Sequence, residues 1–141
     1  MSDFVKRVSE FATKKHIRQV RDVSTIPYIT HPRQVAEILS LVAPMDENLL
    51  CAGWLHDTIE DCGVTWKELS ETFNKDIADL VLEVTKEKPD KNKPAIFPHL
   101  KTQRGYLLKF ADRLSNLSNM KGWPEKKREW YMNKSIFWKT K

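Results

Sequence analysis

Residues 54–61 read WLHDTIED, and this stretch decides how the rest of the chain is interpreted. It follows an apolar run and places His56 and Asp57 side by side, with Glu60 and Asp61 one helical turn later. Because positions four apart share a face of a helix, we expect His56 beside Glu60 and Asp57 beside Asp61. Four titratable groups on one face are costly to bury without a purpose, and a metal ion with an activated water would supply one. From this stretch alone, a helix end whose acids face solvent explains Glu60 and Asp61 equally well.

Two further residues interrupt apolar patterns at positions that would otherwise point inward. His31 lies in PYITHP, residues 27–32, and Asp112 lies in LLKFADRL, residues 107–114. A single residue of this kind is more often a core or capping residue, but here three interruptions follow in the order His, His-Asp, Asp. Two imidazoles and two carboxylates suit manganese, iron or another divalent cation, and the absence of a thiolate argues against a closed structural zinc site.

The order of these residues resembles the HD-domain superfamily of metal-dependent phosphohydrolases. Three extended motifs narrow the resemblance: PYIxHPxxVA at residues 27–36, LHDTIED at 55–61 and KFADRLxNL at 109–117. They resemble the hydrolase domain of the RelA/SpoT-homologue family, whose members of similar size are single-domain small alarmone hydrolases of the Mesh type. The resemblance covers about residues 4–131, which is nearly the whole chain.

This resemblance implies an all-α fold, a single HD-domain helical bundle, with one divalent metal ion, Mn²⁺, as cofactor. It implies that the metal ligands are His31, His56, Asp57 and Asp112. The metal would lower the pKa of a bound water and polarise a phosphoryl oxygen.

The resemblance also assigns the proton-transfer groups. Glu60 and Asp61 would activate the water and relay its proton as the catalytic pair. A carboxylate pair suits this task because one member can stay ionised while like charge raises the pKa of its neighbour.

Substrate contacts are implied where the motifs match. Arg21 corresponds to an Arg that stacks on guanine, which suits a planar and weakly hydrated group. Asn116 and Tyr131 correspond to residues that contact the nucleotide. Each has a simpler interpretation: Arg21 as a surface charge, Asn116 bonded to a helix carbonyl, and Tyr131 as packed core.

The chain departs from the family pattern at two positions near the substrate. Asp22 stands where the family usually has Lys, and Ser118 stands where it has Arg, so two cations are lost. Candidate replacements for the lost phosphate contacts are Lys86, Lys101 and Arg104. The changes leave the predicted metal ligands untouched.

The implied activity is hydrolysis of guanosine 3′,5′-bis(diphosphate), ppGpp, to GDP and pyrophosphate. The altered cations keep a second activity open, hydrolysis of another phosphorylated nucleotide such as the 2′-phosphate of NADPH or a nucleoside monophosphate. A third interpretation is a non-catalytic nucleotide-binding HD module, although a pure binder has no need for both Glu60 and Asp61.

Bulk properties fit a single domain over residues 1–141. No apolar run approaches the roughly 20 residues of a membrane span, and the first residues lack a signal-peptide core. Cys51 lies in an apolar run and is expected to be a reduced thiol, and Cys51 and Cys62 do not form a metal-type pair. We therefore expect a cytoplasmic protein with a small-molecule nucleotide substrate and no membrane partner, and the sequence is compatible with a homo-oligomer.

The net charge of +5 comes from one end of the chain. Residues 121–141 carry seven Lys or Arg and two Glu, whereas residues 1–120 carry 17 charges of each sign. A basic helix with interleaved Trp residues can bind nucleic acid, but more often its Trp face packs and its Lys face is solvated. We expect packing here, and no nucleic-acid partner.

Hydrophobic periodicity predicts helices along most of the chain. A loop is expected over residues 18–30, and another over the Pro- and Lys-rich residues 87–98. A capping box at residues 65–68 predicts a helix start. The helices are expected over residues 3–17, 32–41, 47–60, 65–73, 76–86, 101–120 and 124–138.

Overall fold

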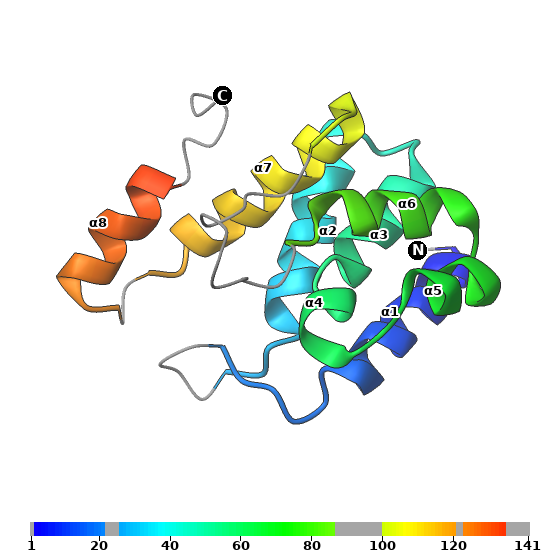
Figure 1. The fold of residues 1–141 in the computed structure, drawn as a ribbon, viewed down its shortest axis with the longest axis horizontal. Coiled ribbons are helices and arrows are strands. Elements are labelled where there is room, and N and C mark those ends of the chain that lie inside the picture. Colours follow the sequence, from blue (N-terminus) through cyan, green and yellow to red (C-terminus); the bar gives the residue numbers. More distant parts are fainter. Residues whose placement is uncertain (1, 22–25, 87–99, 121–122, 135–141) are drawn as a thin grey trace, which may run out of the picture.

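The computed structural model describes residues 2–21, 26–86, 100–120 and 123–134, and these form an all-α bundle (Figure 1). The helices are α1 (Asp3–Lys15), α2 (Thr30–Val42), α3 (Glu47–Leu55), α4 (Thr58–Cys62), α5 (Trp66–Thr72), α6 (Lys75–Val84), α7 (Gln103–Leu117) and α8 (Glu125–Lys134). The described residues contain no strand, only an isolated antiparallel bridge between Val20 and Pro27. None of the described helices has the length and apolar character needed to cross a membrane. The predicted all-α fold is confirmed.

Polar caps fix where most of these helices begin. In each case the residue before the helix accepts a hydrogen bond from the backbone N–H three positions later, which satisfies a donor that has no partner within the helix. The capping residues are Ser2, Asp46, Thr65, Asn74 and Thr102. The predicted start at Thr65 is thereby confirmed. Gly63 directly follows α4 and has a φ of 69°, a left-handed backbone conformation that favours glycine.

Helix α3 is the centre of the bundle and packs against α1, α2, α6 and α7. Its residues Leu49, Ala52 and Leu55 are fully buried. Gly53 allows a close approach, because a Cβ atom there would lie 3.0 Å from Leu39 Cδ1 and 3.2 Å from the backbone of Ala36, both on α2. This contact sets the separation of the two helices that flank the site described below.

The single helix predicted over residues 47–60 is wrong, because α3 ends at Leu55 and α4 begins at Thr58. His56 Nδ1 donates to the Gly53 carbonyl at 2.8 Å, and the Thr58 hydroxyl donates to the Leu55 carbonyl at 2.7 Å. These side chains occupy the carbonyls that the next backbone N–H groups would need to extend α3. His56 and Asp57 therefore lie in a turn between two helices.

The other predicted helices are present with shifted ends. The helix expected over residues 101–120 spans Gln103–Leu117, because Thr102 caps its start. The expected loop over residues 87–98 lies outside the described residues, as does the end of the helix expected over 124–138.

Helix α8 lies apart from the main body, beyond the C-terminal end of α7 (Figure 1). Tyr131 is its buried residue, at 6% exposure, whereas the neighbouring Trp130 is 58% exposed. Trp123 packs edge-on against Tyr131, with ring centroids 5.4 Å apart. The expected Trp packing is seen for Trp123, whereas Tyr131 is the buried ring in the described part of α8. Trp138 lies outside the described residues.

Candidate metal centre and active site

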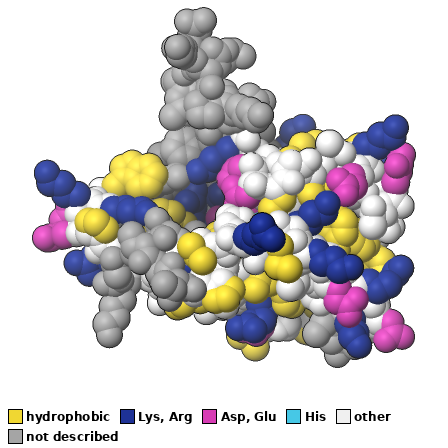
Figure 2. All heavy atoms as spheres, turned by 90° about the horizontal axis from the view of Figure 1, so that it is seen from below, with side chains coloured by type: hydrophobic (Ala, Val, Ile, Leu, Met, Phe, Trp, Pro, Cys, Tyr) yellow, Lys and Arg dark blue, Asp and Glu magenta, His cyan; other side chains and the backbone are white. Residues whose placement is uncertain are grey.

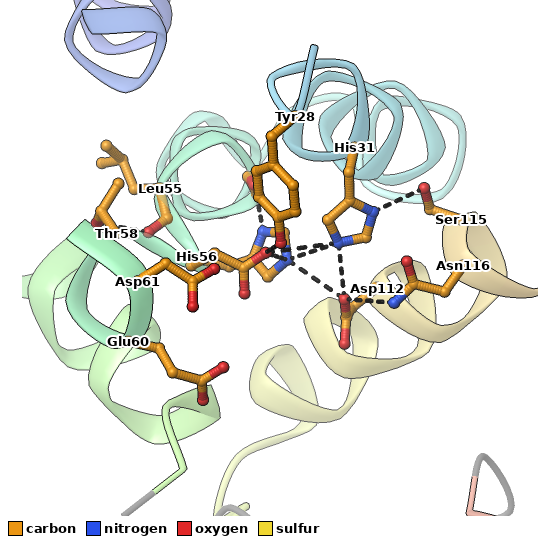
Figure 3. Close-up of polar contacts among 12 residues, drawn as sticks. Tyr28, His31, Leu55, His56, Thr58, Glu60, Asp61, Asp112, Ser115 and Asn116 are labelled. Carbon is orange, nitrogen blue, oxygen red and sulfur yellow. Dashed lines mark hydrogen bonds and ion pairs between the residues drawn. The ribbon is translucent and has the colours of Figure 1, made fainter. Parts of the chain in front are cut away.

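Three side chains from three helices converge on one point inside the bundle (Figure 3). His31 lies in the first turn of α2, His56 caps the end of α3, and Asp112 lies midway along α7. His31 Nε2 is 3.1 Å from His56 Nε2 and 2.9 Å from Asp112 Oδ1. All three residues are buried, and their ligand atoms lie within 4.8 Å of one another, so these residues can hold a metal ion.

Hydrogen bonds on the far side of each ring fix the tautomers. The Gly53 carbonyl accepts from His56 Nδ1, which must therefore carry the hydrogen. Ser115 Oγ donates to Gln34 Oε1 at 2.8 Å, so it accepts from His31 Nδ1 at 3.0 Å. Each Nε2 then presents a lone pair to the other and to a carboxylate oxygen, an arrangement that is repulsive unless a cation lies among them. The donor set, with nitrogen and oxygen atoms and no thiolate, fits a divalent metal ion.

Asp57 joins this group from the turn between α3 and α4. Its Oδ2 lies 3.0 Å from His56 Nε2 and 3.6 Å from His31 Nε2. The Tyr28 hydroxyl donates a short hydrogen bond to the same oxygen. Burial opposes ionisation of Asp57. The positive charge that His56 carries when its Nε2 holds a proton rather than a metal ion outweighs burial and holds the pKa of this carboxyl below its usual range.

Asp112 is supported along its own helix. Lys109 Nζ lies 3.3 Å from its Oδ2, and Asn116 Nδ2 lies 3.5 Å from its Oδ1. Burial acts to raise the pKa of Asp112, but the Lys109 charge and the two imidazoles hold it well below the usual range. Burial lowers the pKa of Lys109 despite the carboxylate beside it. Asp112 is thus held as a carboxylate.

The site opens into a cavity of about 150 Å³. Its lining includes all four predicted ligands and four further predicted residues: Glu60, Lys86, Asn116 and Tyr131. The Tyr131 hydroxyl accepts from Asn116 Nδ2 at 2.7 Å, so the two predicted nucleotide contacts touch each other. Glu60 Oε1 accepts from the Lys86 backbone N–H at 3.1 Å, which brings α4 to the end of α6.

Asp61 and Arg21 lie just outside the lining. Asp61 Oδ2 accepts a 3.5 Å hydrogen bond from Gln19 Nε2. Burial and the charge of Asp57 raise the pKa of Asp61. Arg21 Nη1 donates to Gln34 Oε1 at 3.1 Å, and its charge interacts with Tyr28, Asp112 and Tyr131 of the cavity lining.

Two of the proposed replacement cations are not at the site. Arg104 forms ion pairs with Asp46 at 2.8 Å and Asp76 at 2.9 Å, which tie together the starts of α3, α6 and α7. Its prediction as a phosphate contact is therefore wrong, because these carboxylates occupy its guanidinium. Lys101 is exposed and does not line the cavity. Asp22 lies outside the described residues.

Several polar residues around the predicted ligands were not predicted from the sequence. Ser115 and Gln34 each follow a ligand by one helical turn, a spacing that places them on the ligand's face of the helix. Lys109 precedes Asp112 by one turn in the same way. Tyr28 and Arg113 also line the cavity.

Comparisons with known proteins agree with this geometry. The HD domain family matches residues 9–94. The chain belongs to the HD-domain family. A relative from Xenopus tropicalis, named guanosine-3′,5′-bis(diphosphate) 3′-pyrophosphohydrolase MESH1, is 36% identical over 140 residues, covering 90% of this chain and 78% of its own length.

A second relative and a solved structure are also similar to this chain. A guanosine-3′,5′-bis(diphosphate) 3′-pyrophosphohydrolase of Aquifex aeolicus is 36% identical over 133 residues, covering 89% of this chain but 19% of its own length. A solved structure, described with a metazoan orthologue of SpoT that hydrolyses ppGpp and plays a role in starvation responses, superposes with a TM-score of 0.82. It is 29% identical and covers 96% of this chain and 83% of its own. The chain is therefore similar, over most of its length, to HD domains of the MESH1 and SpoT type.

Proposed function

We propose that this HD-domain protein is a metal-dependent 3′-pyrophosphohydrolase that converts ppGpp and water to GDP and pyrophosphate. The observation that carries the proposal is the convergence of His31, His56 and Asp112 at the wall of a cavity that also holds Asn116 and Tyr131. The similarity to MESH1 over most of both chains supports the choice of substrate.

We infer that His31, His56, Asp57 and Asp112 hold one divalent ion, best satisfied by Mn²⁺. Bound there, the ion would supply a nucleophilic water and polarise the phosphoryl group. The fixed tautomers of the two imidazoles aim both Nε2 atoms at the same point. Tyr28 holds Asp57 in place through its hydrogen bond to Oδ2.

Glu60 and Asp61 are assigned to proton transfer. Glu60 lines the cavity, so it can accept a proton from the attacking water. Asp61 starts the reaction ionised, and its raised pKa suits a group that takes up the proton of the attacking water and passes it to the leaving oxygen. Both side chains come from α4, which the turn at His56 and Asp57 directs across the cavity (Figure 3).

Substrate binding is assigned to residues on the other wall. Asn116 and Tyr131 would contact the nucleoside, with Arg21 stacking on the base. Lys86 and Lys109 line the cavity and offer positive charge to the phosphoryl groups. On the face shown in Figure 2, Lys and Arg side chains are mixed with Asp and Glu rather than gathered in one stripe, which supports a small-molecule substrate over nucleic acid.

A second candidate is a hydrolase for a nucleotide with fewer phosphates, such as NADPH, from which it would remove the 2′-phosphate. The engagement of Arg104 by Asp46 and Asp76 favours it, since this cation does not replace those lost at positions 22 and 118. The assignment of residues 1–141 to one domain stays a prediction. So does a cytoplasmic location, which the two free cysteines support.

The test is a hydrolysis screen with Mn²⁺ over ppGpp, pppGpp, NADPH and nucleoside monophosphates, with products identified by chromatography. We expect GDP and pyrophosphate from ppGpp as the fastest reaction. Faster release of phosphate from NADPH would favour the second candidate. Metal-loaded protein that hydrolyses none of these substrates would contradict both and leave the non-catalytic binding module.

A further inference from the structure

The side-chain carbonyl of Gln34 receives hydrogen bonds from several parts of the chain. Gln34 lies on α2, one turn after His31. Its Oε1 accepts from Arg21 Nη1 at 3.1 Å, from Ser115 Oγ at 2.8 Å and from Asn119 Nδ2 at 3.0 Å. The segment before α2, α2 itself and the C-terminal part of α7 therefore meet at one oxygen atom.

Two of these bonds continue to residues with assigned roles. The Ser115 hydroxyl that donates to Gln34 accepts from His31 Nδ1 at 3.0 Å, so a continuous row of hydrogen bonds runs from the metal-binding imidazole to Gln34. On the other side, Arg21 donates to Gln34 and also reaches the Ser115 carbonyl at 3.5 Å. Gln34 thus stands between the guanidinium and the imidazole.

Gln34 touches neither the converging ligand atoms nor the cavity lining. A half-exposed glutamine on a helix ordinarily keeps its amide in water and retains its rotamer freedom. Here the amide oxygen is turned to buried and half-buried donors instead. The side chain is therefore held in a single orientation by the groups on either side of it.

We propose that Gln34 is a positioning residue that ties the placement of Arg21 to the orientation of His31, so that one side chain sets both nucleotide and metal binding. The part concerning Arg21 rests on the proposed function. The part concerning His31 rests on the hydrogen-bond geometry alone. Partners that orient a metal-bound histidine typically change metal affinity about 10–100-fold when removed.

The first arm of the test measures Mn²⁺ affinity of the nucleotide-free protein by electron paramagnetic resonance of free Mn²⁺. Gln34→Met keeps the length of the side chain but removes the acceptor, and we expect it to weaken Mn²⁺ binding about tenfold. Ser115→Ala should weaken it at least as much. The double variant should bind no more weakly than Ser115→Ala, because both changes act through the same imidazole contact.

The second arm measures kcat and KM on ppGpp at saturating Mn²⁺. Gln34→Met should raise KM about fivefold and change kcat less than about twofold, because the hydrogen bond that positions Arg21 is lost. Ser115→Ala should leave KM within about twofold, since it keeps the hydrogen bond between Arg21 and Gln34. A general structural defect would not separate the two variants in this way.

Two controls complete the design. Gln34→Glu should keep the wild-type Mn²⁺ affinity and the wild-type KM for ppGpp, because a carboxylate can accept hydrogen bonds from all three donors. Gln103→Met, at an exposed position in the first turn of α7, should change neither, and the Tm of every variant is measured alongside. Wild-type Mn²⁺ affinity or unchanged KM in Gln34→Met, or additive losses with Ser115→Ala, would overturn the proposal. If the wild type does not hydrolyse ppGpp, the proposed function and the Arg21 part fail, while the Mn²⁺ arm still decides the His31 part.

Discussion

A methyl group placed on Gly53 would lie 3.2 Å from the backbone of Ala36, closer than van der Waals contact allows without movement. Ala36 follows His31 by five residues on α2, and Gly53 precedes His56 by three on α3. The close approach of these two helices therefore sets the distance between the two imidazoles.

Gly53→Ala should push α2 and α3 apart. We expect it to destabilise the fold by roughly 1–3 kcal/mol and to weaken Mn²⁺ binding more than its effect on Tm alone would suggest. Thermal unfolding and metal titration of the same sample check this. Ser40→Ala, on the exposed side of α2, is the control. Normal metal affinity in Gly53→Ala would show that the helix separation does not control the site.

His56→Ala and Asp112→Ala should each lose metal and turnover together, because both supply ligand atoms at the point of convergence. Metal content by mass spectrometry after dialysis, together with ppGpp hydrolysis, measures both. Asp79→Ala, which removes a surface carboxylate bonded to Lys75, should keep both properties. Full metal occupancy in Asp112→Ala would refute the ligand assignment.

Glu60→Gln and Asp61→Asn should keep the metal but lose turnover by about 10²–10⁴. Glu71→Gln on the exposed side of α5 serves as the control. Wild-type rates in both variants would make the pair ordinary surface acids.

The pH profile tests the role of Asp61. Burial and the Asp57 charge raise the pKa of Asp61, so its ionised form is lost earlier than usual as pH falls. If ionised Asp61 is required, kcat should drop on the acid side of the profile at a pH above the ordinary carboxyl range. The residual rate of Asp61→Asn should lack this acid limb, and an identical limb in that variant would assign the titration to another group.

Tyr131→Phe should raise KM for ppGpp about fivefold and lower kcat by less than this factor. The reason is that it removes the hydroxyl to which Asn116 donates a hydrogen bond. Steady-state kinetics at saturating Mn²⁺ measure the two constants. Tyr106→Phe on α7 is the matched change, since Tyr106 does not line the cavity. Equal effects of the two substitutions would argue against a nucleotide contact at Tyr131.

Arg104→Met should destabilise the protein by about 1–2 kcal/mol at neutral pH without changing kcat or KM. Hydrogen bonds from Arg104 lower the pKa of both Asp46 and Asp76. A depressed carboxyl pKa gives stability that is present above the unfolded pKa of about 4 and lost as pH falls below it. The variant should therefore show a weaker loss of stability as pH falls below the unfolded carboxyl pKa of about 4, measured by urea unfolding at several pH values. Arg33→Met, which breaks an exposed 3.9 Å pair with Glu37, should change little.

The sequence allowed the ligands to be predicted because each one interrupts an apolar pattern, which is a local signal. His31, His56 and Asp112 could be found in this way without knowing how the helices pack. The break between α3 and α4 could not, because it depends on the His56 and Thr58 side chains competing for backbone carbonyls. The place of Arg104 also depends on tertiary structure, since its partners lie 58 and 28 residues away in the chain.

The ion pairs of Arg104 lie near the first turn of α7, whereas Asp112 and Asn116 lie two to three turns further along the same helix. Fold stability and chemistry are therefore encoded in different turns of one continuous helix. The residues around Asn116 could change during evolution to accept a new nucleotide, while the ion pairs of Arg104 keep α7 in its place in the bundle. Substitutions that change substrate preference would then cost little free energy of unfolding. The C-terminal half of α7 is where such substitutions should be sought among related chains.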